Sequence, residues 1–164
     1  MTSLSRIVVF GWGNPSRGDD ALGPALMERV GRWIRLHGGA GVEAVEDFQL
    51  QVEHALDLVD RDLALFVDAR EGGEPAVSLA RIEAAADSSF TTHALSPAAV
   101  LQAYRQVRGQ EAPPSFVLAV RGQSFELGED LSPEARQNLE QAWGLMERLL
   151  DAPSLEAWGA LCTP

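Results

Sequence analysis

Short runs of apolar residues alternate along the chain with segments in which apolar residues recur every three or four positions. Three runs are apolar throughout, which is typical of strands buried on both faces of a sheet: Ile7–Phe10, Leu63–Val67 and Phe116–Val120. Val42–Glu46 and Ala76–Ile82 interleave apolar and polar residues and predict two more strands. Because no helical segment separates Ala76–Ile82 from the run before it, we expect this strand to be antiparallel to a neighbour or to lie at an edge.

Four segments have the apolar spacing or the start signals of helices. The first begins near Asp19 and ends at Gly38-Gly39, and a short one covers residues 52–59. Two others begin at Ser96 and Ser132, each of which precedes a proline, the arrangement of a serine N-cap with proline at the first helical position. Strands that alternate with helices require a mostly parallel sheet. We therefore predict an α/β fold: a three-layer α/β/α sandwich around a mostly parallel five-stranded sheet with one antiparallel strand.

The length of 164 residues predicts a single domain, and the chain has no internal repeat. We place this α/β domain at residues 1–152. Residues 153–164 have weak structural signals, so we expect them to form a loosely docked C-terminal tail. A domain of this size buries enough surface to hold a core without a disulfide or a structural metal.

The composition, 46% hydrophobic and 23% charged, is that of an ordinary globular protein. The formal net charge of −11 disfavours binding to nucleic acid or to an anionic membrane surface. Cys162 is the single cysteine, which excludes an internal disulfide framework and a cysteine-based zinc site. No apolar run approaches the roughly 18 residues of a membrane span, and the first residues lack a signal-peptide pattern, so we expect a cytoplasmic protein.

The loop after the first predicted strand, Gly11–Gly23, contains several candidate functional residues. In parallel sheets, ligands bind to such loops at the carboxyl ends of the strands. Its glycines do not have the Gly-x-Gly-x-x-Gly spacing of a dinucleotide site, and the carboxylates of Asp19 and Asp20 at the helix start would repel a pyrophosphate. Two interpretations stay open: both aspartates cap the helix, or one of them projects into the crevice.

Asp68 directly follows a fully apolar run, which predicts a position at the same edge of the sheet. It either caps a turn or shares a pocket with Asp20, where two like charges would raise a pKa or bind a cation. His37, at a helix end, is interpreted as a partner of the helix dipole, and His54 as a surface or boundary residue. His93 lies in an irregular loop, where a histidine is either a hydrogen-bonding residue or a ligand.

Four segments form a pattern when they are taken together: Gly11-Trp12-Gly13-Asn14 with Asp19-Asp20 and Gly23, Phe66-Val67-Asp68-Ala69, Thr92-His93-Ala94-Leu95-Ser96, and Gly128–Pro133. In order and spacing they resemble the [NiFe]-hydrogenase maturation proteases, and the resemblance covers most of the chain. It implies an α/β endopeptidase that removes a C-terminal peptide from the precursor of the hydrogenase large subunit after nickel has been inserted.

The resemblance also implies the roles of three side chains. Asp20, Asp68 and His93 match the family's metal-contacting residues, so they are the expected catalytic and metal-binding residues. The metal would be nickel supplied by the substrate, and no organic cofactor is expected. The first of these ligands is often glutamate in relatives, so Asp20 has a shorter reach toward the metal.

Two loops are expected to contact the substrate. Many relatives have a glycine- and threonine-rich turn where this chain has residues 47–53, and the Gln-Leu version is similar to maturation proteases of soluble, NAD-linked hydrogenases. Trp12 and Phe48 are interpreted either as anchors for the partner or as core residues. The expected substrate-binding residues are Gly11, Asn14, Asp19, Phe48 and Gln49.

The chemical step and the partner follow from the same resemblance. The metal would polarise the scissile carbonyl or lower the pKa of a bound water, or a carboxylate would act as general base. The expected partner is the large-subunit precursor, with no nucleic acid and no membrane, and we expect a monomer. The alternative function is a non-catalytic, metal-sensing chaperone of hydrogenase assembly. A Rossmann-like enzyme acting on a small molecule and a peptidase of related fold with other substrates are further alternatives.

Overall fold

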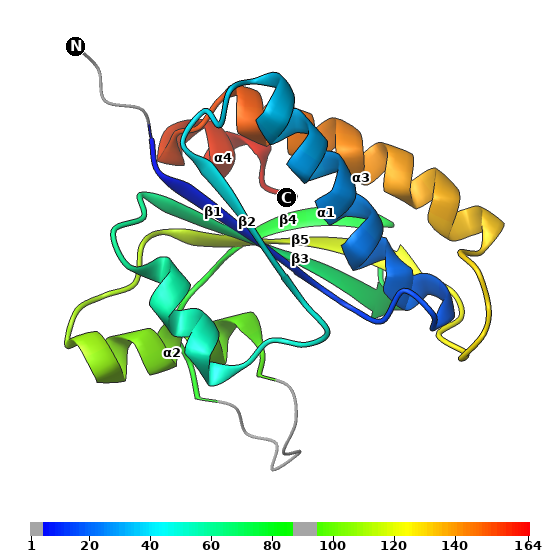
Figure 1. Ribbon diagram of the computed structural model, residues 1–164, viewed down its shortest axis with the longest axis horizontal. Helices are drawn as coiled ribbons and strands as arrows, with labels where there is room; N and C mark the ends of the chain where they lie inside the picture. Colours follow the sequence, from blue (N-terminus) through cyan, green and yellow to red (C-terminus); the bar gives the residue numbers. More distant parts are fainter. Residues whose placement is uncertain (1–4, 87–94) are drawn as a thin grey trace.

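The computed structural model describes residues 5–86 and 95–164, which form a five-stranded sheet between two layers of helices (Figure 1). The strands are β1 (Ile7–Trp12), β2 (Val42–Asp47), β3 (Leu63–Glu71), β4 (Val77–Ile82) and β5 (Ser115–Gly122). They lie in the order β2-β1-β3-β5-β4. β1 is parallel to β2 and β3, and β3 is parallel to β5, whereas β4 is antiparallel to β5. The predicted fold class, including the antiparallel strand, is confirmed.

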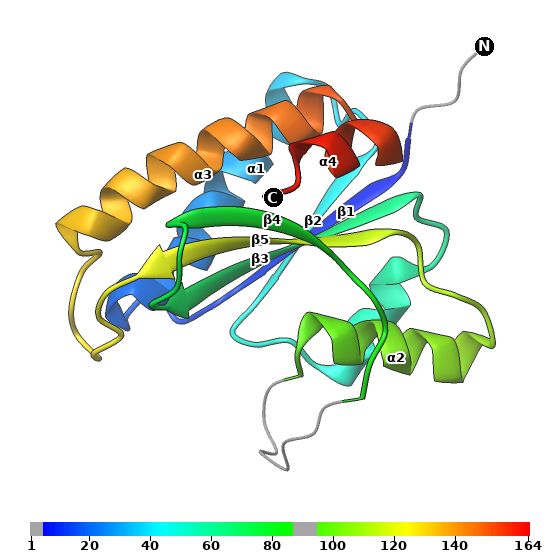
Figure 2. The same ribbon diagram turned by 180° about the vertical axis from the view of Figure 1, so that it is seen from behind.

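Helices cover both faces of this sheet. One face is covered by α1 (Leu22–Leu36), α3 (Pro133–Asp151) and α4 (Leu155–Leu161), and the other by the 3-10 helix η2 (Val52–Leu58) and by α2 (Pro97–Arg108) (Figure 1 and Figure 2). A short 3-10 turn, η1 (Gly18–Ala21), leads into α1. The predicted serine caps are confirmed, because the hydroxyls of Ser96 and Ser132 each accept a backbone hydrogen bond of 3.1 Å. No helix in the two described ranges is both long and apolar enough to span a membrane.

The central strands are buried on both sides, which explains why their sequences are apolar without alternation. Ile7 and Val9 of β1 belong to the core cluster under α1 and α3, and Val8 and Phe10 belong to the cluster under η2 and α2. In the second cluster, the ring of Phe10 stacks on Phe66 of β3 with the ring centroids 4.7 Å apart. A rigid double-sided core therefore holds the carboxyl ends of β1 and β3 in register.

Residues 153–164 are docked, and the expectation of a loose tail was wrong. They contain α4, whose Trp158 is fully buried and donates its indole N–H to the carbonyl oxygen of Leu149 over 2.9 Å. After α4, the backbone N–H of Thr163 donates to the carbonyl oxygen of Leu79 over 2.9 Å, and the hydroxyl of Thr163 accepts from the N–H of Leu79 over 3.0 Å. The segment thus completes the core and pairs with the outer edge of β4.

Candidate active site

The loop that follows β1 is packed too tightly to accept side chains at its glycines. At Gly13, which has a φ of 141°, a Cβ would lie 2.2 Å from the carbonyl oxygen of Asp20. At Gly11 a Cβ would lie 2.1 Å from Cγ of Met27 in α1. Gly11 is also buried, so its position favours a packing role over the substrate contact that we expected. The glycines allow η1 to approach the end of β1.

Asp20 is half-buried in η1 and shapes this loop. Its Oδ2 accepts a hydrogen bond of 2.6 Å from the backbone N–H of Asn14. Asn14 in turn uses its own side-chain oxygen to accept from the N–H of Ser16 over 2.9 Å, which closes a local turn. Asp20 therefore bonds backwards to the loop, and the helix start at Ala21 has no side-chain cap.

The carboxyl group of Asp68 interacts electrostatically with that of Asp20. Burial raises the pKa of the Asp68 carboxyl above its ordinary value; the charge of Arg70 acts against this, and the negative charge of Asp20 raises the pKa further. The pairing of β1 with β3 ends at Gly11 and Val67, so Asp68 lies one residue beyond the last pair. The two predicted ligands therefore interact electrostatically near the carboxyl edge of the sheet.

The position of Asp68 within its strand differs from the sequence-based expectation. We expected the strand to end where its apolar run ends, but β3 continues to Glu71. It continues because β5 pairs with it over this stretch, with Asp68 opposite Ala119 and Glu71 opposite Gly122. The half-buried Asp68 is thus held by a strand on one side while the other side, past the end of β1, is open to the first loop.

The third predicted ligand, His93, lies outside the described residues. The first described residue after it is Leu95, whose backbone N–H donates to the carbonyl oxygen of Leu50 over 3.2 Å. Leu50 belongs to the segment that follows β2, so the chain just after His93 is anchored beside the predicted substrate loop. Within residues 5–86 and 95–164, no three histidine, cysteine, aspartate or glutamate side chains are grouped closely enough to bind a metal.

Asp19 is fully buried and its carboxylate is surrounded by donors. Oδ2 accepts from the N–H of Gln123 (2.6 Å), the N–H of Ser124 (3.2 Å) and the hydroxyl of Ser132 (2.7 Å), and Oδ1 accepts from the N–H of Ser132 (2.7 Å). Burial by itself would raise the pKa of Asp19, but these hydrogen bonds outweigh it and hold the pKa below the ordinary 3.8. This environment favours a structural role for Asp19 over the substrate contact that we expected.

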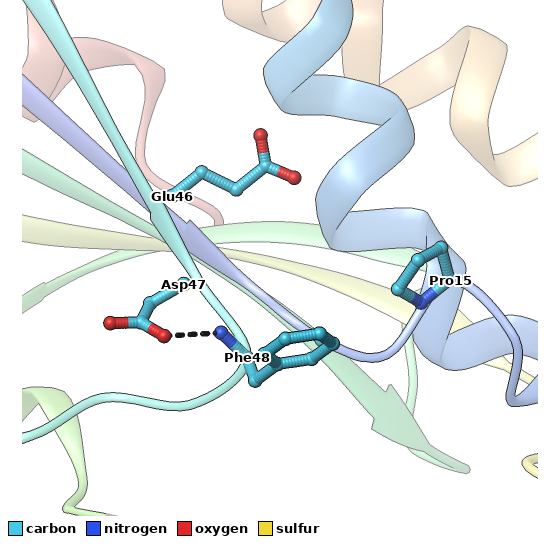
Figure 3. Close-up of a pocket in the computed structure, with 5 residues that line it drawn as sticks. Pro15, Glu46, Asp47 and Phe48 are labelled. Atoms are coloured by element: carbon cyan, nitrogen blue, oxygen red, sulfur yellow. Dashed lines mark hydrogen bonds between the residues drawn. The ribbon is translucent and has the colours of Figure 1, made fainter.

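A pocket of about 360 Å³ opens beside the first loop, between Pro15 and the end of β2 (Figure 3). Phe48 lines it with a side chain that is 71% exposed, so this residue is not part of the core and is free to contact a partner. Trp12 is half-buried, and its ring meets that of Phe66 edge-on with the ring centroids 6.4 Å apart. This contact favours a core role for Trp12 over a role as an anchor for the partner. Gln49, the other predicted contact in this segment, is half-buried.

His54 is buried, and its interpretation as a surface or boundary residue was wrong. Its side chain is 8% exposed; Nδ1 accepts from the backbone N–H of Gln51 over 2.8 Å, and Nε2 lies 3.4 Å from Oδ2 of Asp47. Residues 52–58 form a 3-10 helix. Its inward face consists of His54, Ala55 and Leu58, whereas Val52 and Leu56 are exposed, so the apolar positions alone do not mark the buried face.

Comparison with known proteins finds solved structures that share this fold. No family model matches the chain, and no curated protein matches it significantly. Among solved structures, the [NiFe]-hydrogenase maturation protease HycI from Thermococcus kodakarensis KOD1 aligns with a TM-score of 0.67 and 22% identity, over 90% of this chain and 93% of that chain. The hydrogenase maturating endopeptidase HybD from Escherichia coli aligns with a TM-score of 0.65 and 23% identity, over 90% and 93% of the two chains.

A third structure extends the same result at lower identity. The [NiFe]-hydrogenase maturation protease HybD from Thermococcus kodakarensis has 16% identity and a TM-score of 0.64, over 88% of this chain and 99% of that chain. The coverage is nearly complete on both sides in all three comparisons, so the whole architecture is shared and not a common substructure. The fold of this chain therefore matches that of the [NiFe]-hydrogenase maturation proteases.

Proposed function

We propose that the protein is an endopeptidase that removes the C-terminal extension of a [NiFe]-hydrogenase large-subunit precursor after nickel insertion. The observation that carries this proposal is the electrostatic interaction of Asp20 with Asp68, two residues 48 positions apart, near the carboxyl edge of the sheet. The shared fold with maturation proteases supports the same function.

The donor set suits a divalent ion that is carried by the substrate. Two carboxylates, together with the imidazole of His93 as a third donor, form a mixed oxygen and nitrogen set of the kind that binds nickel or zinc. Three protein donors leave coordination positions for ligands that the precursor brings with the ion. In this proposal nickel is part of the substrate, and Asp20, Asp68 and His93 recognise it.

The electrostatics of the pair explain how cleavage would depend on the metal. Without a cation, burial disfavours ionisation of Asp68, and the negative charge of Asp20 adds to the penalty. A divalent ion held by the docked precursor would remove this repulsion, so a nickel-loaded precursor would bind better than a nickel-free one. The ion would polarise the scissile carbonyl or a water, and a carboxylate of the pair would accept the proton.

A single metal contact does not supply specificity for one protein partner. A standard protein–protein interface buries roughly 1,600 Å² and depends on a few aromatic anchors. Phe48, exposed beside the pocket that it shares with Pro15, has the properties of such an anchor (Figure 3). We therefore expect the precursor to dock across the first loop and the segment that follows β2.

The direct test is incubation of the protein with nickel-loaded and nickel-free precursor, followed by mass spectrometry. Loss of the C-terminal peptide from the nickel-loaded precursor alone is the expected result. Binding without any loss of mass would instead identify a non-catalytic, metal-sensing chaperone. Loss of mass from both precursors at equal rates would show that the protein is a protease but does not recognise the metal.

A further inference from the structure

His54 is a buried polar side chain that connects η2 to the end of β2. Its ring lies edge-on to Phe10 with centroids 6.1 Å apart, and both of its nitrogens face polar partners. The contact at Nδ1 belongs to a capping box: Gln51 is the N-cap of η2, and His54 at the third helical position accepts its backbone N–H. The contact of Nε2 with Asp47 is not part of this cap and needs a separate explanation.

The hydrogen bond at Nδ1 determines where the ring proton lies. Nδ1 accepts from the N–H of Gln51 over 2.8 Å, so it carries no proton in this arrangement. The ring proton is then on Nε2, which is the nitrogen 3.4 Å from the carboxylate of Asp47. The backbone at Gln51 thus selects the tautomer that presents an N–H to Asp47.

Asp47 links this buried ring to the pocket. Its Oδ1 accepts from the backbone N–H of Phe48 over 2.7 Å, a bond drawn in Figure 3, and its carbonyl oxygen accepts from the N–H of Gly13 over 3.3 Å. Its side chain is 40% exposed, whereas that of His54 is 8% exposed. Asp47 therefore contacts the buried ring of His54 and also holds the backbone of the exposed Phe48 and of Gly13 in the first loop.

We propose that His54 is a positioning residue for the substrate-binding segment 47–51, acting through the carboxylate of Asp47. This inference rests on the proposed function, because it assigns the segment a role in binding the precursor. By holding the backbone of Phe48 in one conformation before the precursor arrives, the His54–Asp47 contact lowers the entropy cost of docking. It acts on binding and leaves the chemical step at Asp20 and Asp68 unchanged.

Two substitutions separate the two contacts of His54. In His54→Asn, the side-chain oxygen replaces Nδ1 as acceptor for Gln51, but the shorter side chain does not reach Asp47. We expect KM for the nickel-loaded precursor to rise about fivefold with kcat unchanged, the pattern of a lost binding contribution. In His54→Gln, the amide nitrogen replaces the Nε2 donor, and we expect the KM to return toward the wild-type value.

A double-mutant cycle tests whether His54 acts through Asp47. Asp47→Ala is expected to raise KM at least as much, because it also removes the acceptor of the Phe48 N–H. Adding His54→Asn to it is expected to change KM little further, because the contact between His54 and Asp47 is already broken. The control is His37→Asn: His37 also uses Nδ1 for a backbone contact, with the carbonyl oxygen of Trp33 at 2.8 Å, but it lies at the end of α1. This control is expected to leave KM unchanged.

Backbone ¹⁵N relaxation provides a readout that does not depend on activity. In His54→Asn and in Asp47→Ala, the order parameters of the amides at Phe48 and Gln49 are expected to fall, while that of Gln51 in His54→Asn stays at its wild-type value. Unchanged order parameters at Phe48 in both variants, or additive effects on KM, would overturn the positioning role. If the wild-type protein does not shorten the precursor, the proposed function fails, and the relaxation data still decide whether His54 positions the segment. Asp47 lies at the surface, so its variant remains informative even if His54→Asn does not fold.

Discussion

Asp19 and Asp68 lie at the same end of the sheet but in opposite environments. The carboxylate of Asp19 is fully buried and receives four hydrogen bonds from the loop between β5 and α3, and its pKa is lowered. Asp68 is half-buried beside a second carboxylate, and its pKa is raised by burial and by the charge of Asp20. In the first environment the protein stabilises the charge, and in the second it leaves the charge poorly compensated.

This contrast assigns different tasks to neighbouring residues. Asp19 joins the first loop to the segment 123–132, and the backbone adds a further bond of 2.7 Å from the N–H of Asp19 to the carbonyl oxygen of Ser124. Because Asp19 is fixed in this way, the following residue, Asp20, is held at the carboxyl edge beside Asp68. The carboxylate of Asp19 is satisfied by hydrogen bonds and supports the fold, whereas the charge of Asp68 has no comparable stabilisation.

The largest effect is expected from neutralising the uncompensated pair. Asp68→Asn or Asp20→Asn should reduce processing of a nickel-loaded precursor by roughly a hundredfold or more, because each removes a charge from the reacting site. The free energy of unfolding should change by about 0.5 kcal/mol or less, since both side chains are only half-buried and asparagine keeps an oxygen that can accept the N–H of Asn14. Mass spectrometry of the precursor and thermal unfolding measure the two quantities.

The matched control is Asp151→Asn, which changes an exposed aspartate at the end of α3. This variant should process the nickel-loaded precursor at the wild-type rate. Normal processing by either Asp68→Asn or Asp20→Asn would remove that residue from the site. A large loss of stability in either variant would contradict the difference drawn between Asp19 and this pair, because it would show that Asp20 or Asp68 also stabilises the fold.

The next largest effect is expected on stability at the compensated carboxylate. Asp19→Asn replaces two acceptor oxygens by one oxygen and an NH₂ group, so some of the buried donors at Gln123, Ser124 and Ser132 lose their acceptor. The free energy of unfolding should fall by about 2–3 kcal/mol. Chemical denaturation would measure it, and Asp130→Asn, an exposed aspartate in the same loop, is the control. A loss as small as that of the control would mean that the hydrogen bonds of Asp19 do not stabilise the fold.

The pH dependence of stability should separate Asp19 from other carboxylates. The folded-state pKa of Asp19 is lower than its ordinary 3.8, so the folded protein holds the ionised form more strongly than the unfolded chain does. The stability from Asp19 is therefore fully present above pH 3.8 and is lost as the pH falls through the lower folded-state pKa. The difference in unfolding free energy between the wild type and Asp19→Asn should shrink on acidification in this range. A difference that is independent of pH would contradict the assignment.

The smallest expected effect is on the titration of Asp68 itself. Asp20→Asn removes the negative charge that raises the pKa of Asp68, so this pKa should fall. It should stay above the ordinary value, because burial is the larger cause. Titration of the Asp68 carboxyl followed by ¹³C NMR measures both. An unchanged pKa in Asp20→Asn would show that the two carboxylates do not share a site.

Much of this architecture could be predicted from local patterns. The apolar runs that become β1, β3 and β5 need no partner information, because a strand without polar alternation must be covered on both faces. The serine caps at Ser96 and Ser132, each followed by a proline, are likewise local, since the serine side chain and the proline ring act within one turn of helix. The electrostatic interaction of Asp20 with Asp68 could be predicted from topology, because the carboxyl ends of parallel strands lie at one edge.

Other features depended on contacts that no local pattern encodes. The donors to Asp19 lie 104 to 113 residues away, so the sequence around Asp19 and Asp20 did not distinguish the scaffold residue from the site residue. The burial of His54 depended on the packing of η2 against β1, where its ring meets that of Phe10, and β3 was extended past its apolar run by pairing with β5. The burial of Trp158 required partners that are distant in the sequence or on another helix: the ring of Phe116 in β5 and the carbonyl oxygen of Leu149 in α3.

The sequence by itself determined the layers of this protein and the loops in which its chemistry lies, because hydrophobic periodicity and turn residues act over a few neighbouring positions. Only the tertiary structure decided which aspartate has its negative charge stabilised by hydrogen bonds and which has its pKa raised by a like charge, and that His54 contacts Asp47. Hydrogen bonding and burial depend on groups that folding brings together from distant parts of the chain, and these surroundings determine what each carboxylate and each imidazole can do.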